Sequence, residues 1–132
     1  MLLKPAKEAI DIGMIVSDIA RSLAFYCDLL GLEKTEELPT PFGKLHRLAF
    51  GATDLKLIDS KSPPAAGKIG LTQQLGFRYI TFRIANLTEV CDKLASAGVE
   101  FTMPQREIMP GVLVAMVKDP DGNIVEFVER PG

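Results

Sequence analysis

The chain has 132 residues, of which 47% are hydrophobic and 24% charged, so it is long enough for one domain with a sizeable core and too short for two ordinary ones. A net charge of −2 and the lack of a Lys/Arg-rich run argue against nucleic acid as a partner. No apolar run approaches the roughly 20 residues of a membrane span, and residues 1–9 lack a signal-peptide core, so we expect a cytoplasmic protein with no membrane partner.

The first half of the chain predicts a strand, a helix and two further strands. Alternating apolar residues predict the strands at residues 10–16, 44–50 and 55–59. Apolar residues at helical spacing follow Asp18, a good N-terminal cap, and continue to Gly31, so we expect a helix over residues 19–30. Two prolines and a glycine within residues 36–43 predict a loop.

The second half repeats this order of elements. Alternation predicts strands at residues 77–84, 99–103, 112–117 and 123–129. A helix is expected to begin after Asn86, which would form a capping box with Glu89, and to end before Gly98. Residues 104–111, with a proline at each of two positions, are expected to form a loop.

The two halves are therefore predicted to be copies of one supersecondary unit. Module 1 spans about residues 9–60 and module 2 about residues 77–130, within a single domain of residues 1–132. Residues 61–76 show no element of their own and are expected to be a linker or a flap. A module that cannot bury its own apolar face pairs with a copy. The expected fold class is α+β, with two tandem βαβββ modules paired about a pseudo-twofold axis and sheets that curl around a cleft.

The repeat assigns four polar residues to equivalent positions that face this cleft. Asp11 and Tyr79 each lie seven residues before a helix cap. Lys56 follows Asp11 by 45 residues, and Glu126 follows Tyr79 by 47. We therefore expect these four side chains to lie in one concavity.

Glu126 lies on the last predicted strand, after a sharp turn. Pro120 suits the second position of the turn, and Gly122 can adopt the left-handed conformation that re-aims the chain. Alternation puts Glu126 on the same strand face as Ile124 and Val128. A carboxylate among apolar neighbours needs either a partner or a chemical task.

These motifs carry a resemblance that covers nearly the whole chain. The most specific stretches are residues 16–26, residues 29–32 and residues 119–127. With them the chain resembles the vicinal oxygen chelate superfamily, the glyoxalase I, bleomycin-resistance and extradiol dioxygenase group of paired βαβββ modules.

The resemblance also implies where a metal would bind. Metal enzymes of the superfamily place ligands, commonly His, Glu or Gln, His and Glu, at positions that match Asp11, Lys56, Tyr79 and Glu126. A protonated lysine has no lone pair and a neutral phenol is a poor ligand, so we expect no metal and no other cofactor. Asp11 and Glu126 alone would make only a weak, divergent site. His46 does not add a ligand, because alternation turns it toward the helix side.

Two interpretations of Lys56 and Glu126 stay open. In the first they form a structural ion pair where related enzymes bind a metal. In the second Glu126 is a general base, and Lys56 or Tyr79 stabilises an oxyanion. The catalytic candidates are therefore Glu126, Lys56 and Tyr79.

Strand alternation also predicts a set of residues that line the cleft and bind substrate. They are Asp11, Ile15, Leu45, Arg47, Thr81, Arg83, Val114, Met116, Ile124 and Val128. Arg47 and Arg83, if they face inward, would join Lys56 in favouring an anion. Their alternative is to be solvated charges on the rim, and the alternative for the apolar residues is to be core.

Three functions follow from these residues and the resemblance. The first is a metal-independent isomerase, epimerase or lyase that acts on a small anionic, partly apolar molecule with Glu126 as the base. The second is a non-catalytic protein that sequesters a small molecule, and the third, disfavoured by the ligand losses, is a divergent metal lyase or dioxygenase. Glyoxalase I itself is disfavoured by Ile15, where a basic residue for glutathione would help. A homodimer is expected because open sheet edges need cover, and neither Cys27 nor Cys91 is given a catalytic role.

Overall fold

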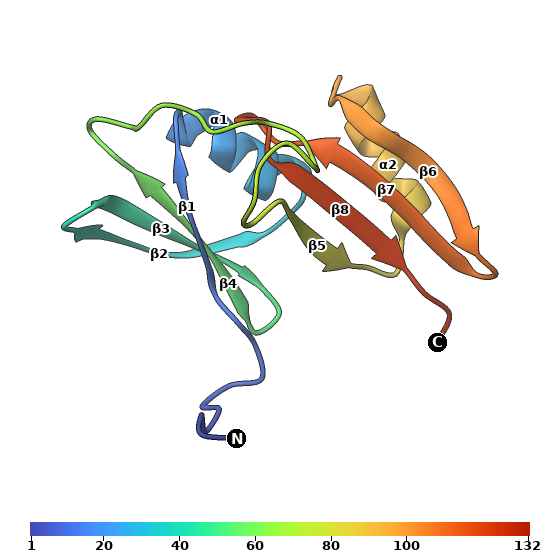
Figure 1. Ribbon diagram of the computed structural model, residues 1–132, viewed down its shortest axis with the longest axis horizontal. Helices are drawn as coiled ribbons and strands as arrows, with labels where there is room; N and C mark the ends of the chain where they lie inside the picture. The colour runs from blue at the N-terminus through green and yellow to red at the C-terminus, as the bar shows by residue number, and fades with distance from the viewer. The chain divides into compact units, whose positions relative to one another are not determined.

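The computed structural model describes residues 1–132 and contains two four-stranded mixed sheets with a helix for each (Figure 1). The chain divides into two compact units, Met1–Pro64 and Ala65–Gly132, whose boundary falls inside the predicted linker. Each unit holds one βαβββ module, which confirms the α+β class and the internal repeat. None of the helices combines the length and the apolar character needed to cross a membrane.

Unit 1 contains the first module. Its elements are β1 (Ile12–Val16), α1 (Ile19–Leu23), the π-helical segment η1 (Ala24–Leu29), β2 (Glu33–Thr40), β3 (Gly43–Phe50) and β4 (Thr53–Asp59). Sheet 1 has the order β1-β4-β3-β2, with β1 parallel to β4 and the other pairs antiparallel. The Asp18 carboxylate accepts a hydrogen bond from the backbone N–H of Arg21 at 3.1 Å, which confirms the predicted cap of α1.

The predicted helix over residues 19–30 is widened in its second half. The backbone N–H of Leu30 donates to the carbonyl of Phe25 at 3.0 Å, five residues back, as in a π-helix. Phe25 and Tyr26 are both buried and meet edge to face with ring centroids 4.9 Å apart. Because a wider turn reduces the angle between consecutive side chains, both neighbouring aromatic rings can reach the core. The segment then ends at Gly31, whose φ of 84° confirms the left-handed position.

Unit 2 contains the second module. Its elements are β5 (Tyr79–Arg83), α2 (Leu87–Ser96), β6 (Phe101–Met109), β7 (Val112–Lys118) and β8 (Ile124–Glu129). Sheet 2 has the order β5-β8-β7-β6, with β5 parallel to β8. The turn before β8 has the predicted geometry, because Gly122 has a φ of 86° and its N–H donates to the Asp119 carbonyl at 3.0 Å.

Two predicted loops are wrong, because both segments are strands at sheet edges. Residues 36–43 belong mostly to β2, and residues 104–111 belong mostly to β6. An edge strand needs hydrogen bonds on one side only, so Pro39 and Pro104 are tolerated there. Strand β6 also contains several register shifts, which obscure its alternation in the sequence.

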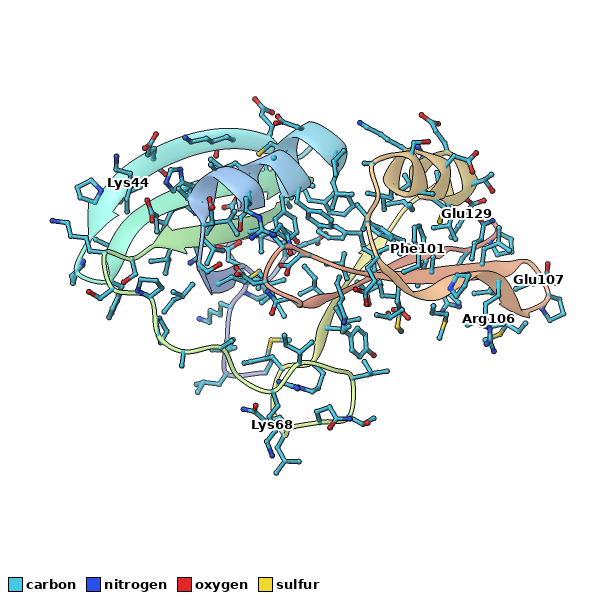
Figure 2. The ribbon with its side chains drawn as sticks, turned by 90° about the horizontal axis from the view of Figure 1, so that it is seen from above. Lys44, Lys68, Phe101, Arg106, Glu107 and Glu129 are labelled. Carbon is cyan, nitrogen blue, oxygen red and sulfur yellow. The ribbon has the colours of Figure 1, made fainter.

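The predicted capping box of α2 is also wrong. Asn86 makes no side-chain capping bond, and its Nδ2 donates instead to Glu89 Oε2 at 3.3 Å. The backbone N–H of Leu87, at the start of α2, donates a hydrogen bond to Glu129 Oε1 at 2.8 Å. Figure 2 accordingly shows Glu129 on the side of sheet 2 that faces α2, and Arg106 on the opposite side. A distant strand therefore supplies the acceptor that the local motif predicted.

His46 lies on the covered side of sheet 1, as its alternation with Arg47 predicted. It pairs with Leu57, is 5% exposed, and neither ring nitrogen has a hydrogen-bond partner. Burial is the main cause that lowers the pKa of His46, and the charges of Lys34 and Lys44 act in the same direction against Glu37 and Asp59. The ring is therefore held neutral, and protonation opposes folding.

We expect His46→Leu to raise the free energy of unfolding by about 1–3 kcal/mol at pH 7.5, because it removes two buried polar atoms that lack partners. A pKa below the ordinary His value means that the unfolded chain binds the proton more tightly, so the wild type loses stability as the pH falls below about 6.5. Urea midpoints at pH 7.5 and pH 5.0 measure both effects. If the wild type and His46→Leu lose the same free energy of unfolding between pH 7.5 and pH 5.0, His46 does not cause the loss of stability in acid.

Candidate functional site

Each sheet has a far face, defined as the face away from the helix of its own unit. On the far face of sheet 1, the pairing of β1, β4 and β3 puts Gly13, Lys56 and Arg47 in one row. Glu36 of β2 extends the row on the other side of Arg47. Lys56 and Arg47 therefore lie side by side on this face, as alternation predicted.

The next row of this face is apolar. Ile15 pairs with Ile58, which pairs with Leu45 on its other side. Ile15 is 50% exposed although it is a large aliphatic residue, and Leu45 is half-buried. The far face of sheet 1 thus offers an apolar strip beside Lys56.

The charged residues predicted to bind substrate in unit 1 are largely engaged with one another. Lys7 Nζ lies 2.6 Å from Asp11 Oδ1 and 3.2 Å from Asp54 Oδ2. Arg47 donates from Nη1 to Asp54 Oδ2 at 3.1 Å and from Nε to Glu36 Oε2 at 2.9 Å. Asp11 Oδ1 also accepts the backbone N–H of Asp54 at 3.1 Å. These five residues form a continuous network, which we call the Lys7 network.

The Lys7 network changes how Asp11 and Arg47 can act. The hydrogen bond from Lys7 is the main cause that holds the pKa of Asp11 below its ordinary value. The hydrogen bond to Glu36 is the main cause that raises the pKa of Arg47. Sequence reasoning missed Lys7 and Asp54. The four-residue spacing of Lys7 and Asp11 was a signal for the first, whereas Asp54 becomes a neighbour only through the sheet.

Lys56 is the cation of this face that makes no salt bridge in unit 1, although its charge is among the smaller causes that lower the pKa of Asp11. It is half-buried and forms no ion pair or side-chain hydrogen bond within its unit. Beside it, a Cβ added at Gly13 would meet no atom within 4 Å. The neighbour of Lys56 on its β1 side therefore has no side chain, and a small side chain there would meet no other group.

Glu126 occupies the corresponding row on the far face of sheet 2. The pairing of β5, β8 and β7 puts Thr81, Glu126 and Met116 side by side, and Met103 of β6 follows. Thr81 Oγ1 donates a hydrogen bond to Glu126 Oε1 at 2.7 Å. Glu126 is half-buried and has no ion-pair partner within unit 2. One carboxylate oxygen is thus held, and the other is free of protein donors within the unit.

The rows on either side of Glu126 contain the other predicted residues of this unit. Tyr79 pairs with Ile124 in one row and is 52% exposed. In the other row Arg83 pairs with Val128, which pairs with Val114. The valines belong to a buried cluster made of Val112, Val114 and Val128, with Met103 packed against it. A carboxylate at the edge of an apolar cluster is the main chemical feature of this unit.

The two far faces confirm the register that the repeat predicted. Gly13 and Lys56 are partners in the parallel pair of unit 1, and Thr81 and Glu126 are partners in the parallel pair of unit 2. Lys56 and Glu126 therefore occupy equivalent positions in the two modules. The far faces thus differ in charge at the same place.

The four side chains that the resemblance implies as metal ligands, Asp11, Lys56, Tyr79 and Glu126, are a poor donor set for a divalent ion. Asp11 Oδ1 is bonded to Lys7, Lys56 is a cation, and Tyr79 is a phenol. No three His, Cys, Asp or Glu side chains come together closely enough to hold a metal ion. The donor set offers one free carboxylate, so no step of a reaction is assigned to a metal. The absence of a metal from the protein stays a prediction.

Comparisons with known proteins agree with this fold. The sequence model of the Glyoxalase/Bleomycin resistance protein/Dioxygenase superfamily matches residues 10–127. A probable lactoylglutathione lyase of Synechocystis sp. is 27% identical over 118 residues, which cover 86% of this chain and 88% of that protein. A glyoxalase family protein of Enterococcus faecalis has a TM-score of 0.72 at 26% identity, covering 98% of this chain and all of that one. TnmS3, an antibiotic binding protein from Streptomyces sp. CB03234, has the same fold with a TM-score of 0.69 at 23% identity, covering 99% of each chain.

Proposed function

We propose, from the premise that the chain belongs to the Glyoxalase/Bleomycin resistance protein/Dioxygenase superfamily, that it catalyses a proton transfer on a small anionic, partly apolar molecule. The reaction would be of the isomerase, epimerase or lyase type. The observation that supports this proposal is Glu126, a half-buried carboxylate with one oxygen held by Thr81 and no cation paired with it in its unit. A carboxylate left in this state is suited to be a general base.

The proposed chemistry begins when Glu126 removes a proton from a carbon next to a carbonyl group. The electron pair of the broken C–H bond moves onto the carbonyl oxygen, and an enolate forms. The oxyanion that forms needs a cation or a hydrogen-bond donor to stabilise it. Return of the proton to the same carbon gives epimerisation, return to a neighbouring atom gives isomerisation, and loss of a leaving group gives elimination.

The preference for an anionic substrate is proposed on charge alone. The Lys7 network holds two cations, Lys7 and Arg47, and three carboxylates, so it carries a net charge of −1 and adds no positive charge to the far face of sheet 1. Lys56 and Arg83 remain as cations without an ion pair in their own units. The apolar part of the substrate is assigned to the methionine and valine side chains beside Glu126.

A second candidate function is non-catalytic binding. The observation in its favour is the apolar cluster of sheet 2 with Met103 against it, since methionine adapts to ligands of varied shape. The names of similar proteins divide in the same way, between lactoylglutathione lyases and an antibiotic binding protein. The presence or absence of turnover separates the two functions.

The test is proton exchange in D₂O followed by NMR. The compounds are S-lactoylglutathione and a panel of 2-oxo and 2-hydroxy carboxylates with apolar side chains, each first screened for binding by thermal shift. The enzyme proposal expects a bound compound to lose one C–H signal faster with protein than without it. Compounds that raise the melting temperature but never exchange would support the binding protein instead.

We also expect that the protein needs no divalent metal, because its donor set supplies a single free carboxylate. Elemental analysis of dialysed protein should find less than one equivalent of Zn, Ni, Mn or Fe, and EDTA should change neither ligand binding nor exchange. One equivalent of metal that survives dialysis and disappears in Glu126→Ala would contradict this expectation.

A further inference from the structure

We propose that Thr81 is a positioning residue for Glu126. Its hydroxyl would fix which carboxylate oxygen is presented to the substrate. This inference rests on the proposed function, since it gives Thr81 a task in the reaction of Glu126. The sequence alone suggested only that Thr81 contacts substrate.

The sheet brings the two side chains together without adjustment. Strands β5 and β8 run parallel, and Thr81 and Glu126 are direct partners on the far face. The donor and acceptor oxygens are 2.7 Å apart, a length expected for an O–H bond to a carboxylate. Threonine is β-branched, so its χ1 angle is restricted and its hydroxyl is a stiff support.

Glu126 needs such a support because little else in unit 2 orients it. Its other row neighbour, Met116, offers only a weak acceptor, and no cation of the unit pairs with it. A glutamate side chain has three rotatable bonds and loses much rotamer freedom when it is fixed. The hydroxyl of Thr81 therefore selects one arrangement of Glu126 from several.

The bond has a consequence for proton transfer. A hydroxyl has one proton to donate, and Thr81 gives it to Oε1, which leaves Oε2 as the proton acceptor. When Oε2 takes the proton, Oε1 becomes the carbonyl oxygen of a carboxylic acid and still accepts the same bond. Thr81 can thus hold Glu126 before and after the transfer.

The internal repeat provides a comparison within the chain. The residue that corresponds to Thr81 in the first module is Gly13, beside Lys56. Glycine has no side chain and can position nothing, and its missing Cβ leaves free space. The module with the carboxylate has a hydroxyl at this place, and the module with the ammonium group has none.

The experiment compares Thr81→Val, which keeps the shape and removes the hydroxyl, with Thr81→Ser, which keeps the hydroxyl. Thr88→Val is the control, because Thr88 lies on α2 and its hydroxyl accepts a hydrogen bond from Gln105. The first readout is the side-chain carboxyl carbon signal of Glu126 in ¹³C-glutamate-labelled, ligand-free protein, assigned as the signal missing from Glu126→Gln. Thr81→Val should shift this signal and average the rotamers of Glu126, and the other two variants should leave it in place.

The second readout is deuterium exchange into the compound of the panel, S-lactoylglutathione or a 2-oxo or 2-hydroxy carboxylate, that the wild type exchanges fastest. Thr81→Val should slow exchange by about ten- to a hundred-fold, the effect of a misplaced catalytic group, while the dissociation constant stays within about twofold. Thr81→Ser should restore the rate. An unchanged carboxyl signal in Thr81→Val overturns the inference, and so does a shifted signal with a wild-type exchange rate.

Failure of the proposed function has a different signature. In that case Glu126→Gln exchanges as fast as the wild type, whereas the carboxyl signal still reports whether Thr81 orients the glutamate. If Thr81→Val and Thr81→Ser both move the signal, the hydroxyl is not what holds Glu126 and the inference falls.

Discussion

Replacement of Glu126 by glutamine is expected to slow proton exchange into a bound substrate by about 10²–10⁴-fold, the usual contribution of a general base. Glutamine has nearly the same shape and still offers Oε1 to Thr81, but its amide cannot take up a proton at neutral pH. Ligand affinity should therefore change much less than the rate. Exchange in D₂O and thermal shift, measured on the same compound, give the two quantities.

Glu129→Gln is the matched control for this substitution. Glu129 lies three residues further along β8 on the side of α2, and glutamine keeps an oxygen for the N–H of Leu87. Its exchange rate should stay within about threefold of the wild type, since only charge remote from the far face is removed. A Glu126→Gln protein that exchanges at the wild-type rate would remove the base from the proposed mechanism. If the wild type and Glu126→Gln both bind the compound and neither exchanges its proton, the result would favour the non-catalytic binding function.

The strands were largely predictable because apolar and polar residues alternate along them with a period of two, a pattern that few other structures produce. The exceptions were β2 and the second half of β6, where prolines indicated loops. Whether a proline is tolerated depends on the position of the strand in the sheet, and no local pattern contains that position. The cap of α2 failed for a similar reason. Asn86 had the right spacing to Glu89, but Glu129 competes for the same helix end from another strand.

The sequence predicted on which face of its sheet each candidate side chain lies. It did not predict the ion-pair and hydrogen-bond partners of those side chains. Lys56 and Glu126 occupy the equivalent rows that the repeat predicted. The state of Arg47 was not predictable, because its partner Asp54 becomes a neighbour only when β3 pairs with β4. The hydrogen bond between Thr81 and Glu126 likewise depends on parallel pairing of strands that are far apart in sequence. Side-chain direction is a local property, whereas charge pairing is a property of the register.

The turn before β8 is expected to be the most sensitive structural feature near Glu126. Asp119 is 6% exposed, and its Oδ1 accepts the backbone N–H groups of Asp121 and Asn123 at 2.9 Å each. Its Oδ2 accepts Nδ2 of Asn123 at 2.9 Å. The Asp119 carboxylate thus accepts hydrogen bonds from the backbone of the turn. These bonds fix the point at which β8, the strand of Glu126, begins.

Asp119→Ala should lower the free energy of unfolding by about 2–4 kcal/mol, because it removes a charged acceptor and leaves part-buried N–H groups without it. Asp119→Asn is the control. An amide oxygen in place of Oδ1 can keep both backbone bonds, so its loss should be about 1 kcal/mol. Urea titration gives both values, provided that the slope with denaturant is unchanged. If alanine and asparagine destabilise equally, the backbone bonds are not the source of the effect, and the carboxylate acts through its charge.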